Sequence, residues 1–224
     1  MKTQAIIPAA GIGTRLHSQE PKPLVLLKGK PLFVHALEAL EQSVFVDSII
    51  VVSRQQNLVA FEKIIQDYKF LKVKKVVAGG KKRRDSVYNG LQALDSDTEL
   101  VLIHDGARPL VSTPMIDEAI KLCKKNDAVV VAVPVKPTIK RVDKENMLVE
   151  QTLNRDLLWE AQTPQVFKKN IIVKAHEQFE DSEATDDAYL VEQLGGKIKV
   201  LEGNYYNIKI TTQEDLKIAE AFLS

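Results

Sequence analysis

A glycine-rich turn near the N-terminus is the first stretch of this sequence that could bind a ligand. The apolar run AIIPAA, residues 5–10, is followed by Gly11 and Gly13 and then by two cations, Arg15 and Lys22. Backbone N–H groups in a glycine turn after a strand form a concavity that attracts anions. Arginine adds a fork of donors and lysine adds a point charge. The spacing therefore predicts a phosphate site, and the cations suit a triphosphate better than a dinucleotide.

Two common phosphate loops do not match the spacing of this turn. The dinucleotide fingerprint needs a third glycine where this sequence has Leu16. The Walker A loop needs four residues between its glycines and then Gly-Lys-Ser/Thr, which the turn lacks. What remains is either another kind of nucleotide loop or an ordinary turn with Arg15 and Lys22 in solvent.

An acidic residue follows a second apolar run. VLIHDGARPL, residues 101–110, leads directly into His104 and Asp105. A carboxylate at the carboxyl end of a strand can hold a hard cation, and Mg²⁺ usually takes one or two carboxylates together with substrate phosphates. We interpret Asp105 as the metal candidate, with capping of the next turn as the alternative, and His104 as a structural histidine.

Paired glycines mark a possible base-binding loop in AGGKKRRDSV, residues 78–87. Gly79 and Gly80 would let backbone groups approach a planar base, and Ser86 lies near a predicted helix start. We interpret the two lysines after the glycines as a solvated charge run.

A lysine also stands between two isoleucines in NIKITTQEDL, residues 207–216. The pattern predicts a short strand in which Lys209 points away from the side that the isoleucines bury. A helix with a capping box follows, with either Thr212 or Thr211 as its N-cap.

The elements that must position these residues alternate along the chain. Apolar runs that predict strands lie at 5–7, 48–53, 72–77, 100–104, 128–133 and 197–202, and stretches of helical spacing lie at 32–40, 58–68, 86–94 and 114–124. This alternation predicts an α/β fold, a Rossmann-like three-layer sandwich with a mostly parallel mixed sheet. Ligands of such sheets bind beyond the carboxyl ends of the strands.

Residues 137–154 break the alternation and predict a protruding β-hairpin arm. Two extended segments, 138–142 and 147–153, are joined by the polar residues 143–146. An isolated hairpin is marginal in water, so the arm either packs on its own domain or is buried against a second subunit.

Composition bounds the class of protein. The 224 residues contain 45% hydrophobic residues, carry a net charge of +1 and include one cysteine, Cys123. We therefore expect a single domain over 1–224, no nonspecific nucleic-acid binding, no intramolecular disulfide and a cytoplasmic location. MKTQAIIPAAG lacks the apolar stretch of a signal peptide, and no run is long enough to span a membrane.

Taken together, the motifs resemble those of the cytidylyltransferases of the nucleotide-diphospho-sugar transferase superfamily, most closely the 2-C-methyl-D-erythritol 4-phosphate cytidylyltransferases of isoprenoid biosynthesis. The eight motifs are AAGIGTR (9–15), PK (21–22), GGxxRxxSV (79–87), HDGARP (104–109), PVKPTIK (134–140), LLWEAQTPQVF (157–167), TDDAYLVE (185–192) and NIKITTQEDL (207–216). They follow one another in the right order over nearly the whole chain.

The resemblance implies transfer of a cytidylyl group from CTP to a polyol phosphate, with Mg²⁺ and with release of pyrophosphate. It implies that nucleotide contacts come from Ala9, Ala10, Gly11, Gly79, Gly80, Ser86, Asp105 and Lys209, with Asp105 also at the metal. Arg15 and Lys22 are implied to stabilise the transition state, and Arg155 and Lys209 to hold the attacking phosphate. Contacts to the polyol phosphate are implied for Arg108, Thr138, Arg155, Thr163 and Thr185.

The resemblance also implies a homodimer in which the arm at 137–154 clasps a partner, so that Thr138 serves the neighbouring site. Two positions depart from the family pattern: Pro137 stands where an aspartate is usual, and Lys81 where acidic or small residues are usual. The rival acceptor is ribitol 5-phosphate, whose cytidylyltransferases share several of these motifs. TIK at 138–140 and LLWEAQTPQ at 157–165 favour methylerythritol phosphate.

Overall fold

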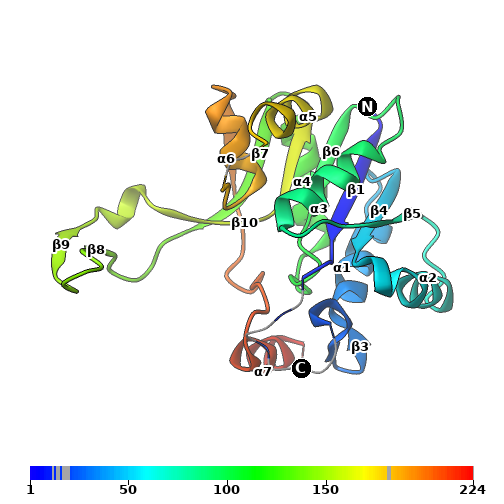
Figure 1. The fold of residues 1–224 in the computed structure, drawn as a ribbon, viewed down its shortest axis with the longest axis horizontal. Helices are drawn as coiled ribbons and strands as arrows, with labels where there is room; N and C mark the ends of the chain where they lie inside the picture. The colour runs from blue at the N-terminus through cyan, green and yellow to red at the C-terminus, as the bar shows by residue number, and fades with distance from the viewer. Residues whose placement is uncertain (12, 14–15, 17–20, 181–182, 224) are drawn as a thin grey trace.

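The computed structural model describes residues 1–11, 13, 16, 21–180 and 183–223. Within them a seven-stranded sheet has the order β11-β7-β10-β6-β1-β4-β5 (Figure 1). Its strands are β1 (Thr3–Pro8), β4 (Ser48–Ser53), β5 (Val73–Ala78), β6 (Leu100–Ile103), β7 (Ala128–Pro134), β10 (Trp159–Lys168) and β11 (Ile198–Glu202). Only β10 runs antiparallel to its two neighbours in this sheet. The predicted mostly parallel mixed sheet is confirmed.

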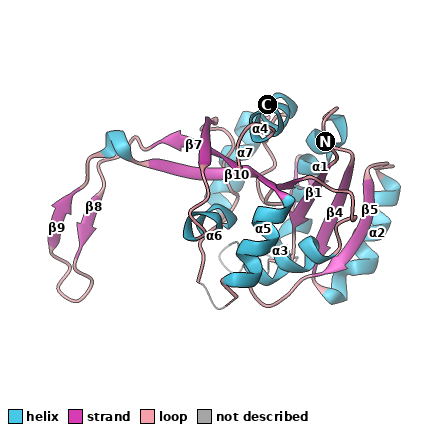
Figure 2. Cartoon of the chain, turned by 90° about the horizontal axis from the view of Figure 1, so that it is seen from above, coloured by secondary structure: helices cyan, strands magenta, loops and turns pink. Residues whose placement is uncertain are grey.

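Helices cover both faces of the sheet, which confirms the three layers (Figure 2). One face packs against α1 (Leu32–Gln42), α2 (Leu58–Asp67) and α4 (Thr113–Cys123). The other packs against α3 (Arg83–Gln92), α5 (Lys169–Gln178) and α6 (Asp187–Gln193). Alternate residues of β1 serve the two faces, because Ala5 and Ile7 belong to the first core and Ile6 to the second.

A smaller subassembly lies beside the carboxyl edge of the sheet. It contains the helix α7 (Gln213–Phe222), the strand pair β2 (Leu26–Leu27) and β3 (Lys30–Pro31), and the short 3₁₀ helix η2 (Lys22–Leu24). Leu27, Ile210 and Ala219 form its buried core. The 3₁₀ helix η2 is held by the buried Pro23 and by Leu24, which packs against the core that includes α1, and Lys22 lies against Gly13. A further 3₁₀ turn, η3 (Gln55–Asn57), precedes α2.

The strand β10 was not predicted, because its sequence WEAQTPQVFK has polar residues where a central strand is usually apolar. Gln162, Thr163 and Gln165 are nonetheless buried and hydrogen-bonded. Gln165 Nε2 donates to Asp186 Oδ2 at 2.8 Å, and Gln162 Nε2 donates to the Asn204 carbonyl at 3.0 Å. The strand predicted around Lys209 is wrong, because residues 207–210 are irregular in the structure. The helix after it is confirmed, with a capping box between Thr212 and Asp215.

The predicted hairpin arm is confirmed and extends well away from the sheet (Figures 1 and 2). It pairs β8 (Lys140–Val142) with β9 (Val149–Thr152) in antiparallel register and ends in the 3₁₀ turn η4 (Arg155–Leu157). Its tip carries apolar side chains in solvent, with Met147 76% exposed and Leu148 65% exposed. Within a single chain, the arm therefore leaves apolar surface uncovered.

Among the helices of the described residues, none is long and apolar enough to cross a membrane.

Candidate active site

The loops that follow β1 and β5 leave the sheet side by side at its carboxyl edge. Ala9 N donates to the Val52 carbonyl at 2.7 Å, and Gly79 N donates to the Ser53 carbonyl at 2.7 Å. Both acceptors belong to the end of β4, which lies between β1 and β5. The glycine turn at 9–11 and the paired glycines at 79–80 are thus brought to one edge, as the parallel topology predicts.

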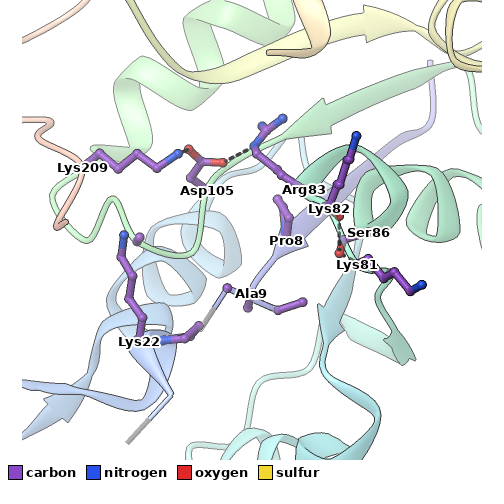
Figure 3. A pocket seen from close by; sticks show the side chains of 14 residues that line it. Pro8, Ala9, Lys22, Lys81, Lys82, Arg83, Ser86, Asp105 and Lys209 are labelled. Carbon is purple, nitrogen blue, oxygen red and sulfur yellow. Dashed lines mark hydrogen bonds and ion pairs between the residues drawn. The ribbon is translucent and has the colours of Figure 1, made fainter. Parts of the chain in front are cut away.

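A cavity of about 190 Å³ opens between these loops (Figure 3). It is lined by Pro8, Ala9, Ala10, Gly11, Lys22, Pro23, Gly80, Lys81, Lys82, Arg83, Ser86, Asp105, Ala107 and Lys209. We call it the first cavity. All the predicted nucleotide residues except Gly79 line it, and Lys22 joins them. Arg15 lies outside the described residues.

Glycine is required at 79 and 80 because the loop is pressed against the first turn of α3. A Cβ at Gly80 would lie 2.3 Å from the Asp85 Cβ, and one at Gly79 would lie 2.6 Å from the Ser86 Oγ. The Ser86 hydroxyl holds this approach, since it accepts from Gly80 N at 3.2 Å and donates to the Lys82 carbonyl at 3.2 Å. The N–H groups of Gly79 and Gly80 are thus both engaged within the protein, and Gly80 lines the first cavity. Binding of a planar base by this loop stays a prediction. Lys81 and Lys82 are both exposed, in keeping with a solvated charge run, but both also line the first cavity.

Gly13 fixes the glycine turn against Lys22. It has a φ of 71°, and a Cβ there would lie 2.5 Å from the Lys22 Cβ. A side chain is therefore excluded by conformation and by space. Figure 3 shows the Lys22 ammonium pointing toward the pair formed by Asp105 and Lys209.

Asp105 is buried and held by two cations. Arg83 Nε donates to Oδ1 at 2.9 Å, and Lys209 Nζ lies 2.7 Å from Oδ2, as the dashed lines in Figure 3 show. Burial alone would raise the pKa of this carboxyl, but Arg83 and Lys209 hold it well below its usual range. Asp105 is therefore ionised at neutral pH. The prediction that Lys209 points away from its neighbouring isoleucines is confirmed by this contact.

A second cavity, also of about 190 Å³, adjoins the first. It is lined by Arg83, Asp105, Arg108, Ala161, Gln162, Thr163, Gln165, Thr185, Asp186 and Lys209. Arg108, Thr163 and Thr185, which the resemblance assigns to the polyol phosphate, thus lie together. Arg83, Asp105 and Lys209 line both cavities, so two ligands bound in them would meet at this charged group.

The segment that carries Lys209 is tied to the wall of the second cavity. Arg108 Nη1 donates to the Asn207 carbonyl at 2.6 Å, and Asn207 Nδ2 donates to the Thr163 carbonyl at 2.8 Å. Arg108 and Asn207 are both buried. The alternating pattern suggested a strand because Ile208 and Ile210 pack on the core around Leu27 while Lys209 contacts Asp105.

His104 is a structural histidine, as interpreted from the sequence. It is completely buried, with Nε2 3.1 Å from the Arg108 carbonyl and Nδ1 3.0 Å from the Thr163 hydroxyl. Burial lowers the pKa of His104 to about 4, so the ring is neutral at pH 7. A neutral ring can donate from Nε2 and accept from Thr163, whose oxygen also accepts from Asp105 N at 3.1 Å.

Thr138 and Arg155 line neither cavity of their own chain. Both are exposed on the arm, and Arg155 Nη1 donates to the Lys136 carbonyl at 2.8 Å. The structure of one chain therefore does not bring these two predicted acceptor residues to the site.

Arg83 and Asp187 are site residues to which the sequence analysis gave no role. Arg83 Nη1 donates to Asp187 Oδ2 at 2.7 Å while its Nε binds Asp105. A run of four cations at 81–84 looks like a solvated surface. The available signal is spacing, because Arg83 lies three residues before Ser86 and hence on the same face of α3.

Carboxylates are sparse in the first cavity. Asp105 is the one acidic side chain among the described residues that line it. Nowhere in the described part of the chain do three or more histidine, cysteine, aspartate or glutamate residues form a group that could hold a metal. A metal here would need most of its ligands from a substrate.

Comparison with known proteins agrees with this geometry. The family model for 2-C-methyl-D-erythritol 4-phosphate cytidylyltransferase matches residues 3–224. A protein of that name from Alkaliphilus oremlandii is 46% identical over 99% of this chain and 95% of its own length. One from Halalkalibacterium halodurans is 43% identical over 100% of this chain and 98% of its own.

Solved structures show the same fold. The crystal structure of 4-diphosphocytidyl-2C-methyl-D-erythritol synthase from Anaerococcus prevotii matches with a TM-score of 0.87 and 38% identity, over 99% of this chain and 96% of that one. The 2-C-methyl-D-erythritol 4-phosphate cytidylyltransferase of Thermus thermophilus matches with a TM-score of 0.81 and 29% identity, over 100% and 99% of the two chains. The chain described here belongs to the 2-C-methyl-D-erythritol 4-phosphate cytidylyltransferase family.

Proposed function

We infer that this protein is a nucleotidyltransferase that transfers the cytidylyl group of CTP to 2-C-methyl-D-erythritol 4-phosphate. The products are 4-diphosphocytidyl-2-C-methyl-D-erythritol and pyrophosphate, in the non-mevalonate route to isoprenoids. The observation that carries this function is the pair of adjoining cavities that share Arg83, Asp105 and Lys209. A transfer between two substrates needs both of them bound with their reacting groups at one point.

The first cavity is the proposed CTP site. Backbone groups of Gly79 and Gly80, with Ser86 behind them, would bind the cytosine, and Ala9, Ala10 and Gly11 would cover the triphosphate. Asp105 would lie at the ribose. Lys22 also lines this cavity and would supply positive charge to the triphosphate, and Arg15 is proposed to act with it.

The second cavity is the proposed site of the acceptor. Its Arg108 guanidinium and Thr163 are buried, and the exposed Thr185 also lines the cavity, a mixture that suits an anionic group carried on a polyol. Lys209, which lines both cavities, would hold the attacking phosphate beside the α-phosphorus of CTP.

The chemistry requires positioning and charge rather than a side-chain nucleophile. An oxygen of the acceptor phosphate forms a bond to the α-phosphorus, the bond from that phosphorus to the bridging oxygen breaks, and pyrophosphate leaves with the electron pair. A phosphate monoester is already ionised near pH 7, so no general base is needed. Lys22, Lys209 and Arg15 would offset the charge that gathers on the α-phosphate and the leaving group.

Mg²⁺ is the proposed cofactor, and the donor set fits it. Mg²⁺ is usually held by one or two carboxylates plus substrate phosphates, and Asp105 offers one ionised carboxylate at the first cavity. When bound, Mg²⁺ would neutralise part of the triphosphate charge.

We propose that the protein works as a homodimer through the arm at 137–154. The arm places Thr138 and Arg155 outside both cavities of their own chain, and its apolar tip is exposed. In a dimer these two side chains would complete the acceptor site of the partner. We also propose that 1–224 acts as one catalytic domain, and that it works in the cytoplasm, where CTP is made.

The function is tested by measuring pyrophosphate release with each of the four common ribonucleoside triphosphates, crossed against methylerythritol phosphate and ribitol phosphate. We expect turnover for CTP with methylerythritol phosphate and at least 10-fold lower kcat/KM for every other pair, because lost hydrogen-bond partners are costly in a fitted site. Preference for ribitol phosphate, or for another nucleotide, would contradict the proposal.

A further inference from the structure

We propose that Asp187 is a positioning residue for the transfer reaction: acting through Arg83 and Asp105, it fixes the Lys209 ammonium between the two cavities. This role rests on the proposed function of the site. The residue itself touches neither substrate in our assignment, since Asp187 is not among the described residues that line either cavity.

A continuous chain of charged contacts carries the proposal. Lys209 Nζ lies 2.7 Å from Asp105 Oδ2, and Arg83 Nε lies 2.9 Å from Asp105 Oδ1. Arg83 Nη1 then lies 2.7 Å from Asp187 Oδ2, and His176 Nε2 lies 3.1 Å from Asp187 Oδ1. Three helices (α3, α5 and α6), the loop after β6 and the irregular segment before α7 supply these residues, so the contacts connect parts of the fold that are far apart in the sequence.

The geometry leaves Asp187 little freedom. Both of its carboxylate oxygens are engaged, and Asp187 and His176 are each 1% exposed. The Arg83 guanidinium is held by two carboxylates through different nitrogens, which fixes its plane as well as its position. Asp105 therefore meets a rigid donor on one oxygen and presents the other to Lys209.

Stability alone is a weak reason for this arrangement. Burying paired charges costs desolvation that their attraction roughly offsets, so such pairs often add little to the free energy of unfolding. Buried ion pairs can instead hold the Lys209 ammonium beside the reacting phosphorus. Displacement of a catalytic group by about 1 Å can lower the rate 100-fold.

The variant Asp187→Asn distinguishes a positioning role of Asp187 from an effect of its charge, because the two explanations predict different changes in kcat. Removing one negative charge makes the site more positive, so an effect of charge alone would tighten CTP binding and leave kcat undiminished. Loss of positioning would instead lower kcat about 10-fold. We expect the lower kcat, with the equilibrium affinity for CTP changed less than about 3-fold, as measured by pyrophosphate release and calorimetry.

A double-variant cycle tests whether the effect passes through Lys209. We expect Asp187→Asn to lower kcat in the parent and to have no further effect in a Lys209→Met background, because the group being positioned is gone. Equal fold-losses in both backgrounds would overturn the proposal, since a general loss of structure acts on both. Asp95→Asn is the matched control: it breaks ion pairs with Lys2 and Lys75, away from both cavities, and should leave kcat unchanged.

His176 gives a second test should Asp187→Asn fold poorly. His176→Phe keeps a ring beside Tyr88, whose centroid lies 6.2 Å from that of His176, but removes the donor to Asp187. We expect kcat about 3-fold lower, and recovery in His176→Gln, whose amide can donate. No difference between the phenylalanine and glutamine variants would count against the proposal.

A crystal structure of Asp187→Asn, or of His176→Phe if the first does not fold, decides the matter independently of activity. We expect the 2.7 Å contact between Lys209 Nζ and Asp105 Oδ2 to be lost or lengthened. If that contact is kept, the proposal that Asp187 positions Lys209 is wrong, whatever the activity of the variant. If the parent protein shows no transfer to methylerythritol phosphate, the proposed function fails, while this structure still decides what Asp187 does to Lys209.

Discussion

Lys22 reaches the first cavity from η2, and its place depends on two features outside the glycine turn. Gly13 packs on its stem, and Pro23 and Leu24 pack the 3₁₀ turn from which it extends into the protein interior. The side chain therefore projects into the cavity from a supported base. In the proposed reaction it offsets charge on the α-phosphate and the departing pyrophosphate.

We expect Lys22→Ala to lower kcat about 10²- to 10³-fold, as for removal of one preorganised electrostatic donor. The measurement is pyrophosphate release at saturating substrates, with circular dichroism to verify the fold. Lys63→Ala, on the exposed side of α2, serves as the control and should match the parent. Turnover by Lys22→Ala equal to that of the parent would remove Lys22 from the transition state.

His104 should make the protein sensitive to mild acid. Its pKa is about 4 in the folded state against 6.5 for the free side chain, a difference of about 2.5 units. Between pH 6.5 and 4 the unfolded state binds the proton and the folded state does not, so stability falls as the pH falls. The loss amounts to about 3 kcal/mol when complete.

Urea unfolding at pH 7 and pH 4.5 measures this effect. His104→Gln will be less stable than the parent at pH 7, because the ring fills a buried site, but it should lose less stability between the two pH values. An identical loss in parent and variant would show that His104 is not the acid-sensitive group.

At the residue scale, the site was predictable where a side chain acts through a loop of recognisable spacing. Asp105 and the glycines at 79–80 follow strands, and Ser86 lies in the first turns of α3, close to its predicted place near a helix start. Arg83 and Asp187 were missed because their partners lie far away in sequence. Within the charge run, only the three-residue spacing of Arg83 from Ser86 indicates that one of its members turns inward.

At the scale of elements, α3 and the glycines before it form the wall that would receive the base. Gly80→Ala would place a Cβ 2.3 Å from the Asp85 Cβ, and neither atom belongs to the far end of a flexible chain. The loop or the first turn of α3 must move. We expect a loss of about 1–3 kcal/mol in stability, typical of overpacking, and an increase in KM for CTP that exceeds any increase for the acceptor.

Gly11→Ala is the matched control for the expected loss in the free energy of unfolding. An added Cβ at Gly11 has nothing within 4 Å, so the free energy of unfolding should not fall. Urea unfolding and steady-state kinetics of both variants make the comparison. Equal stability of Gly80→Ala and the parent would mean that the close approach at Gly80 is not strained by a side chain.

Helices and strands were predictable where the spacing of the apolar residues and the length of the apolar segment indicate the same kind of element. The predicted strand at 48–53 coincides with β4, and the helix predicted at 58–68 ends one residue beyond α2. The strand β10 was not predictable in this way, because Gln162, Thr163 and Gln165 are buried for their hydrogen bonds rather than for apolar area. These polar side chains line the second cavity, where an apolar central strand would offer no hydrogen-bonding groups.

At the scale of the whole molecule, the arm decides whether one chain is enough. Thr138 and Arg155 lie outside both cavities of their own chain. If Arg155 serves the partner, mixing two defective variants should restore activity. In a heterodimer of Arg155→Ala and Lys209→Met, one site has both residues intact and the other has neither.

We expect a refolded equimolar mixture of these two variants to regain about a quarter of the parent activity, since half of the dimers are mixed and half of their sites are intact. Each variant alone is the control and should stay nearly inactive. If Arg155 acted within its own chain, every site in the mixture would lack one residue, and the mixture would be no more active than its components.

The central claim is that two substrates meet where the cavities share Arg83, Asp105 and Lys209. A crystal structure with the product, 4-diphosphocytidyl-2-C-methyl-D-erythritol, tests it most directly. We expect one product molecule to span both cavities, with its cytosine at Gly79 and Gly80, its polyol beside Thr163, and its diphosphate at Lys209. A product confined to one cavity, or bound with its diphosphate away from Lys209, would contradict the account.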